Sequence, residues 1–270
     1  MKNISNYEKK KIIENKPLVS IVTVVFNGEK YLEETILSVI NQTYMNVEYI
    51  IIDGGSTDET VDIIKKYENK IDYWVSEKDA GIYDAMNKGI DLVNGDWINF
   101  MNAGDVFYDI TTIKKIFQNN LHANINFIYG NLDINYESFN KTKKALSLEY
   151  FWKGMPFSHQ SVFINSSFHK LNKYNLDYKI ASDFHLFYNS YQKKNKFYYI
   201  NKTISVVLFG GLSDNNHLQV LEENYQIIKD NNFKTKYYIY YHYMHIIVRL
   251  KNFIKLILGN KLSSLVKKIK

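Results

Sequence analysis

Cysteine is absent from the 270 residues, and proline occurs only at positions 17 and 156. Without cysteine the chain can form no disulfide framework, no cysteine-ligated zinc or iron–sulfur site, and no cysteine nucleophile. An excess of basic charge is also missing from most of the chain. Nine of the 34 basic residues lie beyond Asp230, which leaves 25 basic and 28 acidic residues in 1–230. A nucleic-acid-binding surface is therefore not expected on this part.

Long apolar runs are missing as well. The most apolar stretch near the C-terminus, residues 237–248, has 12 uncharged residues, whereas a membrane-spanning helix needs about 20. Hydrophobic residues make up 46% of the chain and charged residues 23%, as in an ordinary globular protein. The length suits one large domain with a C-terminal appendage.

The first hundred residues alternate between buried strands and amphipathic helices. Runs rich in Val and Ile predict strands, and between them apolar residues recur at helical spacing. The expected strands are 19–26, 47–52, 71–75 and 97–101, and the expected helices are 30–41, 57–69 and 81–93. This alternation is typical of β-α-β units, so we predict an α/β fold with a Rossmann-like, mostly parallel sheet flanked by helices.

The second half is less regular. Here we expect strands at 124–129 and 161–164, helices at 182–192 and 214–231, and a long strand or hairpin at 197–209. No repeat or low-complexity linker interrupts the chain. We therefore divide it into an extension (1–16), a nucleotide-sugar-binding half (17–109), an acceptor and catalytic half of the same domain (110–232) and a tail (233–270).

Polar clusters follow the four expected strands of the first half, at the edge where ligands bind in open parallel sheets. Each cluster taken singly is also what turns and helix caps need. No Gly-x-Gly-x-x-Gly and no Gly-x-x-x-x-Gly-Lys-Ser/Thr motif occurs, so dinucleotide oxidoreductases and P-loop nucleotide-triphosphatases are not expected. Carboxylates without a phosphate loop can hold a diphosphate through Mg²⁺ or Mn²⁺, and Asp105 is the natural protein ligand.

Four segments together resemble the nucleotide-sugar half of family 2 glycosyltransferases, which are inverting enzymes with the GT-A fold. The matching segments are residues 19–29 (VSIVTVVFNGE), 38–43 (SVINQT), 48–58 (EYIIIDGGSTD) and 79–89 (DAGIYDAMNKG). The version with Gly-Ile-Tyr-Asp-Ala-Met-Asn is similar to bacterial enzymes that build capsule, O-antigen or exopolysaccharide repeats of the colanic-acid type.

The resemblance implies roles for single residues. The edge from Thr23 to Asn27 and the Asp53 carboxylate would hold the uracil and ribose of a UDP-sugar. Asp79 and Asn87 would close over the donor, and the family's Asp-x-Asp position falls on 102–105. The residues expected to contact the donor are Thr23, Val25, Asn27, Glu29, Asp53, Asp79, Gly81, Asn87, Asn102, Ala103, Gly104, His159 and Gly211.

This chain departs from the family at the Asp-x-Asp position. Asn102 replaces the first Asp, and one extra residue separates it from Asp105. A neutral Asn can still hydrogen-bond to ribose. We expect Asp105 to be the ligand of a divalent Mn²⁺ or Mg²⁺ ion, with substrate phosphate completing the coordination.

An inverting transfer needs one general base for the acceptor hydroxyl. The resemblance places it at the start of a helix in the second half, on Asp183, although a helix-start acid also has a purely structural explanation in the helix dipole. The pair His159 and Gln160 would lie near the diphosphate and acceptor, although His159 could also be a hydrogen-bonded, half-buried histidine. Gly211 would lie in a loop beside the leaving group, or in a plain turn.

The tail carries only positive charge, since no acidic residue follows Asp230. Apolar residues from Ile246 to Leu258 recur at helical spacing with basic residues opposite them, and residues 262–270 repeat the pattern after Gly259 and Asn260. A basic amphipathic helix is typical of an element that lies on an anionic membrane surface. A helix packed on the body with a solvated basic face is the alternative.

Together these features predict a metal-dependent inverting transferase of hexosyl or N-acetylhexosaminyl groups in surface polysaccharide synthesis. The donor would be a nucleotide-sugar, with UDP favoured, and the acceptor a glycan or polyprenol-diphosphate-linked sugar. We expect a peripheral protein on the inner face of a bacterial cytoplasmic membrane. A sugar nucleotidyltransferase and a non-catalytic nucleotide-sugar- or membrane-binding module remain alternatives.

Overall fold

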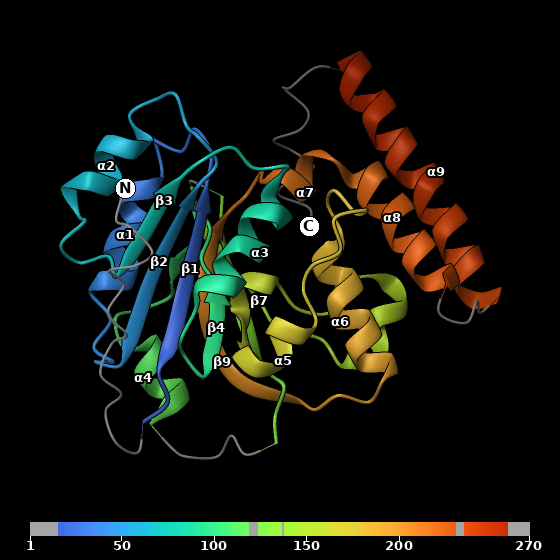
Figure 1. Cartoon of the computed structure of the whole chain (residues 1–270). Helices are drawn as coiled ribbons and strands as arrows, with labels where there is room; N and C mark the ends of the chain where they lie inside the picture. Colours follow the sequence, from blue (N-terminus) through green and yellow to red (C-terminus); the bar gives the residue numbers. More distant parts are fainter. Residues whose placement is uncertain (1–15, 119–123, 137, 231–234, 259–270) are drawn as a thin grey trace.

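A computed structural model describes residues 16–118, 124–136, 138–230 and 235–258 (Figure 1). The first half contains β1 (Val19–Val25), α1 (Leu32–Ile40), β2 (Val47–Asp53), α2 (Thr60–Lys66), β3 (Tyr73–Ser76), α3 (Ile82–Leu92) and β4 (Trp97–Phe100). The second half adds β5 (Val106–Phe107), α4 (Thr112–Phe117), β6 (Phe127–Asn135), β7 (Asn140–Lys143), η2 (Leu148–Lys153), η3 (His159–Ser161), β8 (Val162–Asn165), α5 (Ser166–Leu171), α6 (Ser182–Gln192), β9 (Phe197–Leu208), α7 (Leu212–Asn215), α8 (His217–Asp230) and α9 (Thr235–Leu258).

All the described strands belong to one mixed sheet. Its order is β3-β2-β1-β4-β8-β6-β9-β5, with β7 paired to β6. The pairs among β1 to β4 are parallel, as predicted, so their carboxyl ends share one edge. Strand β8 runs antiparallel to both β4 and β6. The sheet is therefore parallel in the first half and mixed in the second, and the predicted α/β fold is confirmed.

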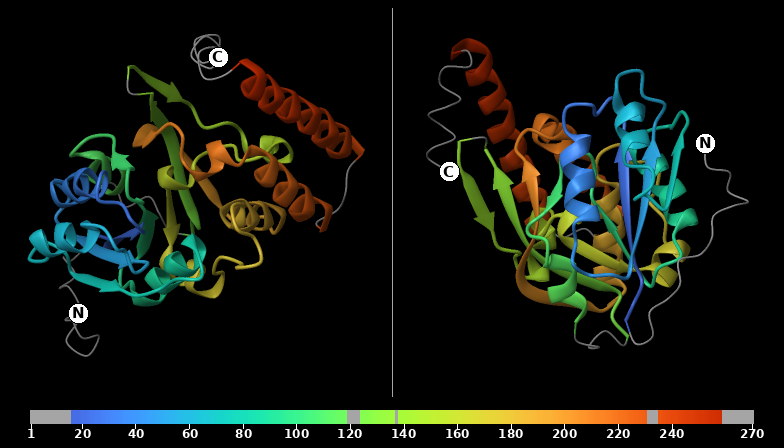
Figure 2. Two further views of the ribbon diagram at one scale, coloured as in Figure 1. Left: turned by 90° about the horizontal axis from the view of Figure 1, so that it is seen from above. Right: turned by 90° about the vertical axis from the view of Figure 1, so that its left-hand side faces the viewer.

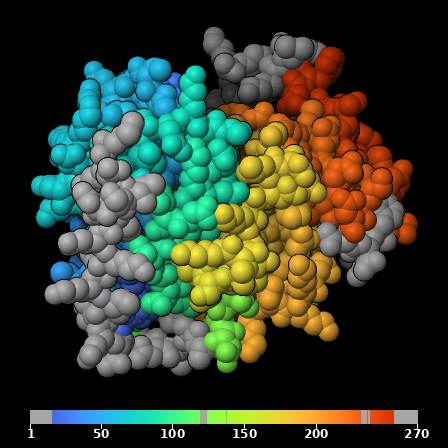
Figure 3. All heavy atoms as spheres, in the orientation of Figure 1, coloured from blue at the N-terminus to red at the C-terminus, as the bar shows by residue number. Residues whose placement is uncertain are grey.

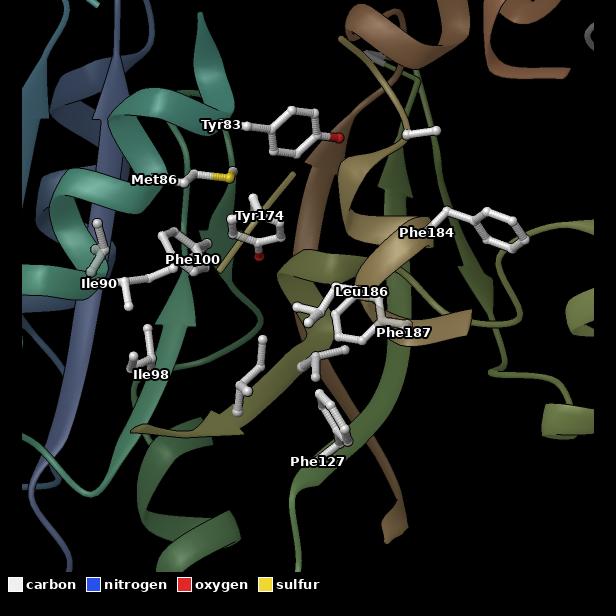
Figure 4. Close-up of a cluster of buried hydrophobic side chains, with 14 of the residues drawn as sticks. Tyr83, Met86, Ile90, Ile98, Phe100, Phe127, Tyr174, Phe184, Leu186 and Phe187 are labelled. Carbon is white, nitrogen blue, oxygen red and sulfur yellow. The ribbon is translucent and has the colours of Figure 1, made fainter. Parts of the chain in front are cut away.

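Two hydrophobic cores cover the two faces of the sheet. Side chains of β1 point to the two faces in turn. Val19 and Ile21 belong to one core, and Val22 and Val24 belong to the other. Helices α1, α2 and α4 contribute to the first core, whereas α3, α6 and α8 contribute to the second. Figure 2 shows the ribbon of this layer in two further views, and Figure 4 shows its side chains, with Tyr83 of α3 extending toward α6.

Several expectations for the second half need correction. Of the long strand or hairpin expected at 197–209, the long strand is confirmed as β9, whereas the expected helix at 214–231 is divided into α7 and α8 at Asn216. Helix α4 and strands β5 and β7 were not predicted, because their six, two and four residues are too short for a periodic signal.

Helices α8 and α9 lie side by side at one side of the molecule (Figures 1 and 3). Tyr225 of α8 stacks on Tyr241 of α9 with ring centroids 4.2 Å apart, and Tyr240 meets Trp152 of η2 edge to face at 5.4 Å. The aromatic run at 237–248 and the amphipathic segment at 246–258 form one helix, α9. The repeat predicted at 262–270 lies outside the described residues. In the part of the chain that is described, no helix combines the length and apolarity needed to cross a bilayer.

Candidate active site

Hydrogen bonds join the loops that follow β1 and β2. The Asn27 N–H donates to Ser56 Oγ at 2.7 Å, and Asn27 Oδ1 accepts from the Thr57 N–H at 2.9 Å. Glu29 Oε2 accepts from the Glu59 N–H at 3.0 Å. Asn27 has a φ of 50°, a conformation that asparagine tolerates better than most residues. We call these joined loops, residues 26–29 and 54–59, the donor rim.

Asp53 ends β2 beneath the donor rim and is fully buried. Its Oδ1 accepts from the Ser56 hydroxyl at 2.5 Å, and its Oδ2 accepts from the Ser76 hydroxyl at 2.5 Å. Oδ2 also accepts from the N–H groups of Gly55 and Ser56 at 3.2 and 3.1 Å. This carboxylate therefore organises the loop after β2. Its expected hydrogen bond to a nucleotide base stays a prediction.

The predicted edge from Thr23 to Asn27 is only partly exposed. Thr23 Oγ1 donates to the Met101 carbonyl at 2.7 Å and lies 3.0 Å from the Tyr49 hydroxyl, inside the sheet. Val25 is buried as well. Asn27 and Glu29 are the exposed members of the predicted set on this edge. Thr23 and Val25 therefore lie beneath the surface that a donor would meet.

Asp79 lies against the donor rim. A Cβ placed on Gly54 would come within 3.0 Å of Asp79 Oδ2. Asp79 Oδ1 pairs with Lys88 Nζ at 2.5 Å, and the same ammonium lies 2.8 Å from Glu77 Oε1. Burial raises the pKa of the Asp79 carboxyl, against the lowering effect of Lys88. Gly81, at a φ of 128° that favours glycine, is the N-cap of α3.

Asn87 of α3 makes a two-point contact with backbone. Its Nδ2 donates to the Tyr174 carbonyl at 2.9 Å, and its Oδ1 accepts from the Tyr174 N–H at 2.9 Å. The amide thus ties α3 to the segment before α6. Its predicted contact with the donor stays a prediction.

The turn at 102–105 follows β4 and is held by α1. Thr35 Oγ1 accepts from the Gly104 N–H at 3.0 Å and donates to the Asp105 carbonyl at 2.9 Å. Gly104 has a φ of 98°, which favours glycine. Ala103 lies against the donor rim, since a Cβ on Gly28 would meet its Cβ at 3.4 Å. The turn therefore continues the edge formed by the donor rim.

The Asp105 carboxylate is buried in this turn, and its Oδ2 accepts from Gln160 Nε2 at 3.1 Å. Burial raises the pKa of this carboxyl to about 6, and the charge of His159 and the bond from Gln160 oppose that rise only in part.

The same turn offers oxygen ligands for a cation. Asn102 Oδ1 is buried and has no hydrogen-bond partner among the described residues, although it lies three positions before the Asp105 carboxylate. The described part of the chain contains no group of three or more His, Cys, Asp and Glu side chains that could hold a metal. With only Asn102 and Asp105 to offer, the turn suits a Mg²⁺ or Mn²⁺ ion that would take most of its ligands from a diphosphate and water, and the unpartnered Asn102 Oδ1 fits such a role.

His159 connects this turn to the second half. Its Nδ1 lies 3.2 Å from Asp183 Oδ2, and its Nε2 lies 3.3 Å from Asn102 Nδ2. With a proton on Nδ1, the ring donates to Asp183 and accepts from Asn102, which satisfies both nitrogens. Burial lowers the pKa of the imidazole, but the hydrogen bond and charge of Asp183 and the charge of Asp105 raise it above its usual value overall.

Asp183 lies in the first turn of α6, with 15% of its side chain exposed. Its Oδ1 accepts from the Tyr83 hydroxyl at 3.1 Å and from the Phe184 N–H at 2.8 Å. Figure 4 shows Tyr83 extending from α3 toward this region. The structure thus brings together the turn at 102–105 and Asp183, joined by the consecutive residues His159 and Gln160.

Gly211 lies at the exposed start of α7, and a Cβ there would meet nothing within 4 Å. Its φ of −62° is open to any residue. The chain as described therefore does not require glycine at this position, and the predicted approach to a diphosphate stays a prediction.

The sequence reasoning missed several residues of the site. Tyr83 contacts Asp183 directly, and Thr35 holds the turn between Asn102 and Asp105. Gln160, which was expected beside His159 near the diphosphate, contacts Asp105. Tyr83 lies four residues before Asn87, so helical spacing places both on one face of α3 and gave a usable signal. Thr35 was predicted only as part of the apolar stripe of its helix.

Comparisons with known proteins agree with one another. The model of a family described as Glycosyl transferase family 2 matches residues 20–193. A PGL/p-HBAD biosynthesis glycosyltransferase of Mycobacterium bovis is 30% identical over 172 residues, which cover 62% of this chain and 67% of the relative.

Solved structures share the fold at low sequence identity. The TarS fragment 1–349 of S. aureus in complex with UDP-GlcNAc aligns with a TM-score of 0.62 and 16% identity, over 80% of this chain and 68% of that one. The mannosyltransferase PcManGT from Pyrobaculum calidifontis, in complex with GDP-Man and Mn²⁺, aligns with a TM-score of 0.62 and 12% identity, over 90% of this chain and 74% of that one.

Proposed function

The chain belongs to glycosyl transferase family 2 and is a glycosyltransferase, and from this premise we propose that it moves a sugar from a UDP-sugar to a glycan acceptor with inversion at the anomeric carbon. The observation that carries the proposal is the direct connection of Asp183 to the turn at 102–105 through His159 and Gln160. A base and a site for the diphosphate then adjoin each other, as one displacement step requires.

Asp183 is the proposed general base. Oδ1 already accepts two hydrogen bonds, from Tyr83 and the Phe184 N–H, whereas the structure shows one contact to Oδ2, from His159. A carboxylate oxygen has two lone-pair sites, so Oδ2 can take the proton of the acceptor hydroxyl. The acceptor oxygen bonds to the anomeric carbon, the bond from that carbon to the phosphate oxygen breaks, and the nucleoside diphosphate leaves with the electron pair.

The donor would lie along the donor rim and the turn at 102–105. We assign base and ribose contacts to Asn27 and Glu29, the exposed members of this edge, and to Asp53 beneath them, with Asp79 beside them. Support comes from the shared position of these groups at the carboxyl ends of β1, β2, β3 and β4. The structural neighbours are complexes with UDP-GlcNAc and with GDP-Man.

Asn102 and Asp105 would hold a divalent cation, Mn²⁺ or Mg²⁺, and one structural neighbour is a complex with Mn²⁺. Such an ion supplies positive charge against the departing diphosphate. Gln160 holds the Asp105 carboxylate through the hydrogen bond to Oδ2, and Thr35 holds the turn itself.

The acceptor would be a glycan, with a polyprenol-diphosphate-linked sugar expected, in the synthesis of a surface polysaccharide such as a capsule or O-antigen. The name of the mycobacterial relative, a biosynthesis glycosyltransferase, favours a biosynthetic role of this kind. We assign residues 17–109 to donor binding and residues 110–232 to the acceptor and the catalytic base.

The tail would bring the enzyme to an anionic membrane surface at the cytoplasmic face. Apolar side chains at alternating spacings of four and three residues form one stripe on α9, and each is more than half exposed: Ile239, Tyr243, Ile246, Leu250 and Phe253. No acidic residue follows Asp230.

The variant Ile246→Gln/Leu250→Gln should lose flotation with phosphatidylglycerol vesicles, while Tyr225→Leu, on α8, should keep it. Equal flotation of the first variant and the wild type contradicts this role.

The donor proposal is tested by thermal unfolding with UDP, GDP, dTDP and CMP, each with and without Mn²⁺. At 100 times its dissociation constant, a ligand stabilises the fold by about 2.7 kcal/mol. We expect UDP with Mn²⁺ to give the largest rise in Tm. No rise with any nucleotide would contradict the donor site and favour a non-catalytic module.

A further inference from the structure

One side chain of α8 binds the backbone just before α6. Glu223 Oε2 accepts from the N–H groups of Ile180 and Ala181 at 3.0 and 2.9 Å. Glu223 Oε1 accepts from the Lys179 N–H at 3.2 Å. Three successive N–H groups thus converge on one carboxylate, 42 to 44 positions away in the sequence. Converging backbone donors of this kind are a concave site for an anion.

The bound segment leads directly to the proposed base. Ala181 is the N-cap of α6 but makes no side-chain cap, and Asp183 is the second residue of the helix. Glu223, from a different helix, therefore supplies the negatively charged acceptor that a capping residue usually provides at a helix N-terminus. Bonds to these backbone donors restrain the position of the first turn, and with it the Asp183 carboxylate.

The same segment is held from the opposite side by the residue that contacts Asp183. The Tyr83 hydroxyl lies 3.0 Å from the Ile180 carbonyl and 3.1 Å from Asp183 Oδ1. The one hydroxyl hydrogen of Tyr83 is shared between these two acceptors. Ile180 is therefore held at its carbonyl by α3 and at its N–H by α8. The Glu223 carboxylate is itself oriented by Gln219 Nε2, which donates to Oε1 at 2.9 Å.

We propose that Glu223 is a positioning residue for the transfer reaction, because its carboxylate fixes residues 179–181 and so directs Asp183 toward the acceptor hydroxyl. This inference rests on the proposed role of Asp183 as the base. It assigns part of the active site to α8, which is the helix that packs against α9.

The test compares Glu223→Ala with Glu222→Ala. Both variants remove one carboxylate from adjacent positions of α8, but Glu222 faces His245 of α9 at 3.7 Å rather than the segment before α6. The first readout is hydrogen–deuterium exchange at the amides of 179–181 in the full chain. The second is the kcat and KM of nucleotide release with water as the acceptor, using UDP-GlcNAc, UDP-glucose and GDP-mannose as probes.

We expect Glu223→Ala to expose these amides to faster exchange and to lower kcat about 10- to 100-fold, since small misplacements of a catalytic group cost rates of this order. The KM for the donor should stay within twofold, and Glu222→Ala should match the wild type in all readouts. Glu223→Gln keeps one acceptor oxygen, so it should restore part of kcat, and it replaces the alanine variant if that variant does not fold.

A kcat within twofold of the wild type in Glu223→Ala and Glu223→Gln overturns the inference. A fall in Tm with unchanged kcat does so as well, because it shows that Glu223 only stabilises the fold. Asp183→Asn is measured in parallel. If that variant releases nucleotide normally, the proposed base is wrong, whereas an inactive Asp183→Asn beside a normal Glu223→Ala contradicts the positioning role alone.

Discussion

The two sides of the candidate site are held in different ways. On the donor side, Asp53 takes its hydrogen bonds from Gly55, Ser56 and Ser76, all within 23 positions along the chain. On the acceptor side, Asp183 is contacted by Tyr83 from 100 positions away, and its helix is held by Glu223. Asp53 is therefore held by residues near it in the sequence, whereas Asp183 and the start of its helix are held by distant residues of α3 and α8.

This difference predicts which properties a mutation on each side should change. A change in the donor rim breaks a local loop and should weaken stability and donor binding together. A change around Asp183 should leave the donor side intact, since the contacts of the base come from α3, η3 and the N-terminus of its own helix. Donor binding and transfer should therefore be separable by mutation.

The sharpest separation is expected from Asp183→Asn. The amide cannot take the acceptor proton, so transfer should fall by about 10² to 10⁴. Donor binding should remain, which is checked by the rise in Tm with UDP and Mn²⁺ beside nucleotide release. Asp177→Asn, an exposed change before the same helix, serves as the control. Normal turnover in Asp183→Asn rules out this residue as the base.

Two buried ionisable side chains, one in each half, differ in how fully they are hydrogen-bonded. Glu48 in the first half accepts from the Ser20 hydroxyl and from two groups of Asn94. His169 in the second half donates from Nδ1 to the Asn172 carbonyl, but its Nε2 has no partner among the described residues. Burial lowers the pKa of His169 to about 4.

A depressed histidine pKa means that the fold favours the neutral ring. The resulting stability is present above pH 6.5 and is lost as the pH falls toward 4, by about 3 kcal/mol. In His169→Phe the loss of unfolding free energy between pH 7 and pH 4 should therefore shrink by about that amount, measured by urea unfolding. An unchanged pH dependence in the variant contradicts a buried neutral His169.

A smaller effect on stability is expected from Asp53→Asn on the donor side. The amide nitrogen would face donors that now bind a carboxylate, so unfolding free energy should fall by about 2 kcal/mol and UDP binding should weaken with it. Asp62→Asn, in an exposed pair with Lys65, should change stability by less than about 0.5 kcal/mol. An unfolding free energy equal to that of the wild type in Asp53→Asn would contradict the role of this carboxylate in holding the loop after β2.

The smallest effect is expected from Thr35→Val. The change keeps the shape of the side chain and removes the hydroxyl that binds Gly104 and Asp105, at a cost of about 1 kcal/mol. The rise in Tm with UDP should become less dependent on Mn²⁺. Thr142→Val, on the exposed strand β7, is the control. Equal Mn²⁺ dependence in Thr35→Val and the wild type shows that the turn holds without this bond.

The strands and helices of the first half were predicted better than those of the second half for a physical reason. Buried runs such as 19–25 and 47–53 make the parallel strands recognisable, and the carboxyl ends of such strands must share one edge. Asp53 and Asp105 could therefore be placed together before any coordinates. Their burial could not be foreseen, because it depends on the packing of Ser76 and Gln160 around them.

The surroundings of Asp183 were harder to predict, because the residues that hold it and its helix are far away in the sequence. A motif placed Asp183 at a helix start, but nothing in the local sequence pointed to Glu223 as the residue that holds the segment before this helix. The short elements β5 and β7 carry too few residues for a periodic signal. The exposed stripe of α9, in contrast, followed directly from the spacing of its apolar residues.

The most direct test of a single base acting in one displacement is the configuration of the first product. The nucleotide-sugar that raises the Tm most, in its α-linked form, is incubated with the wild-type chain, and the released sugar is followed by ¹H NMR before it mutarotates. Attack by a water molecule that Asp183 deprotonates predicts the β-anomer as the first product. The α-anomer appearing first would contradict this account.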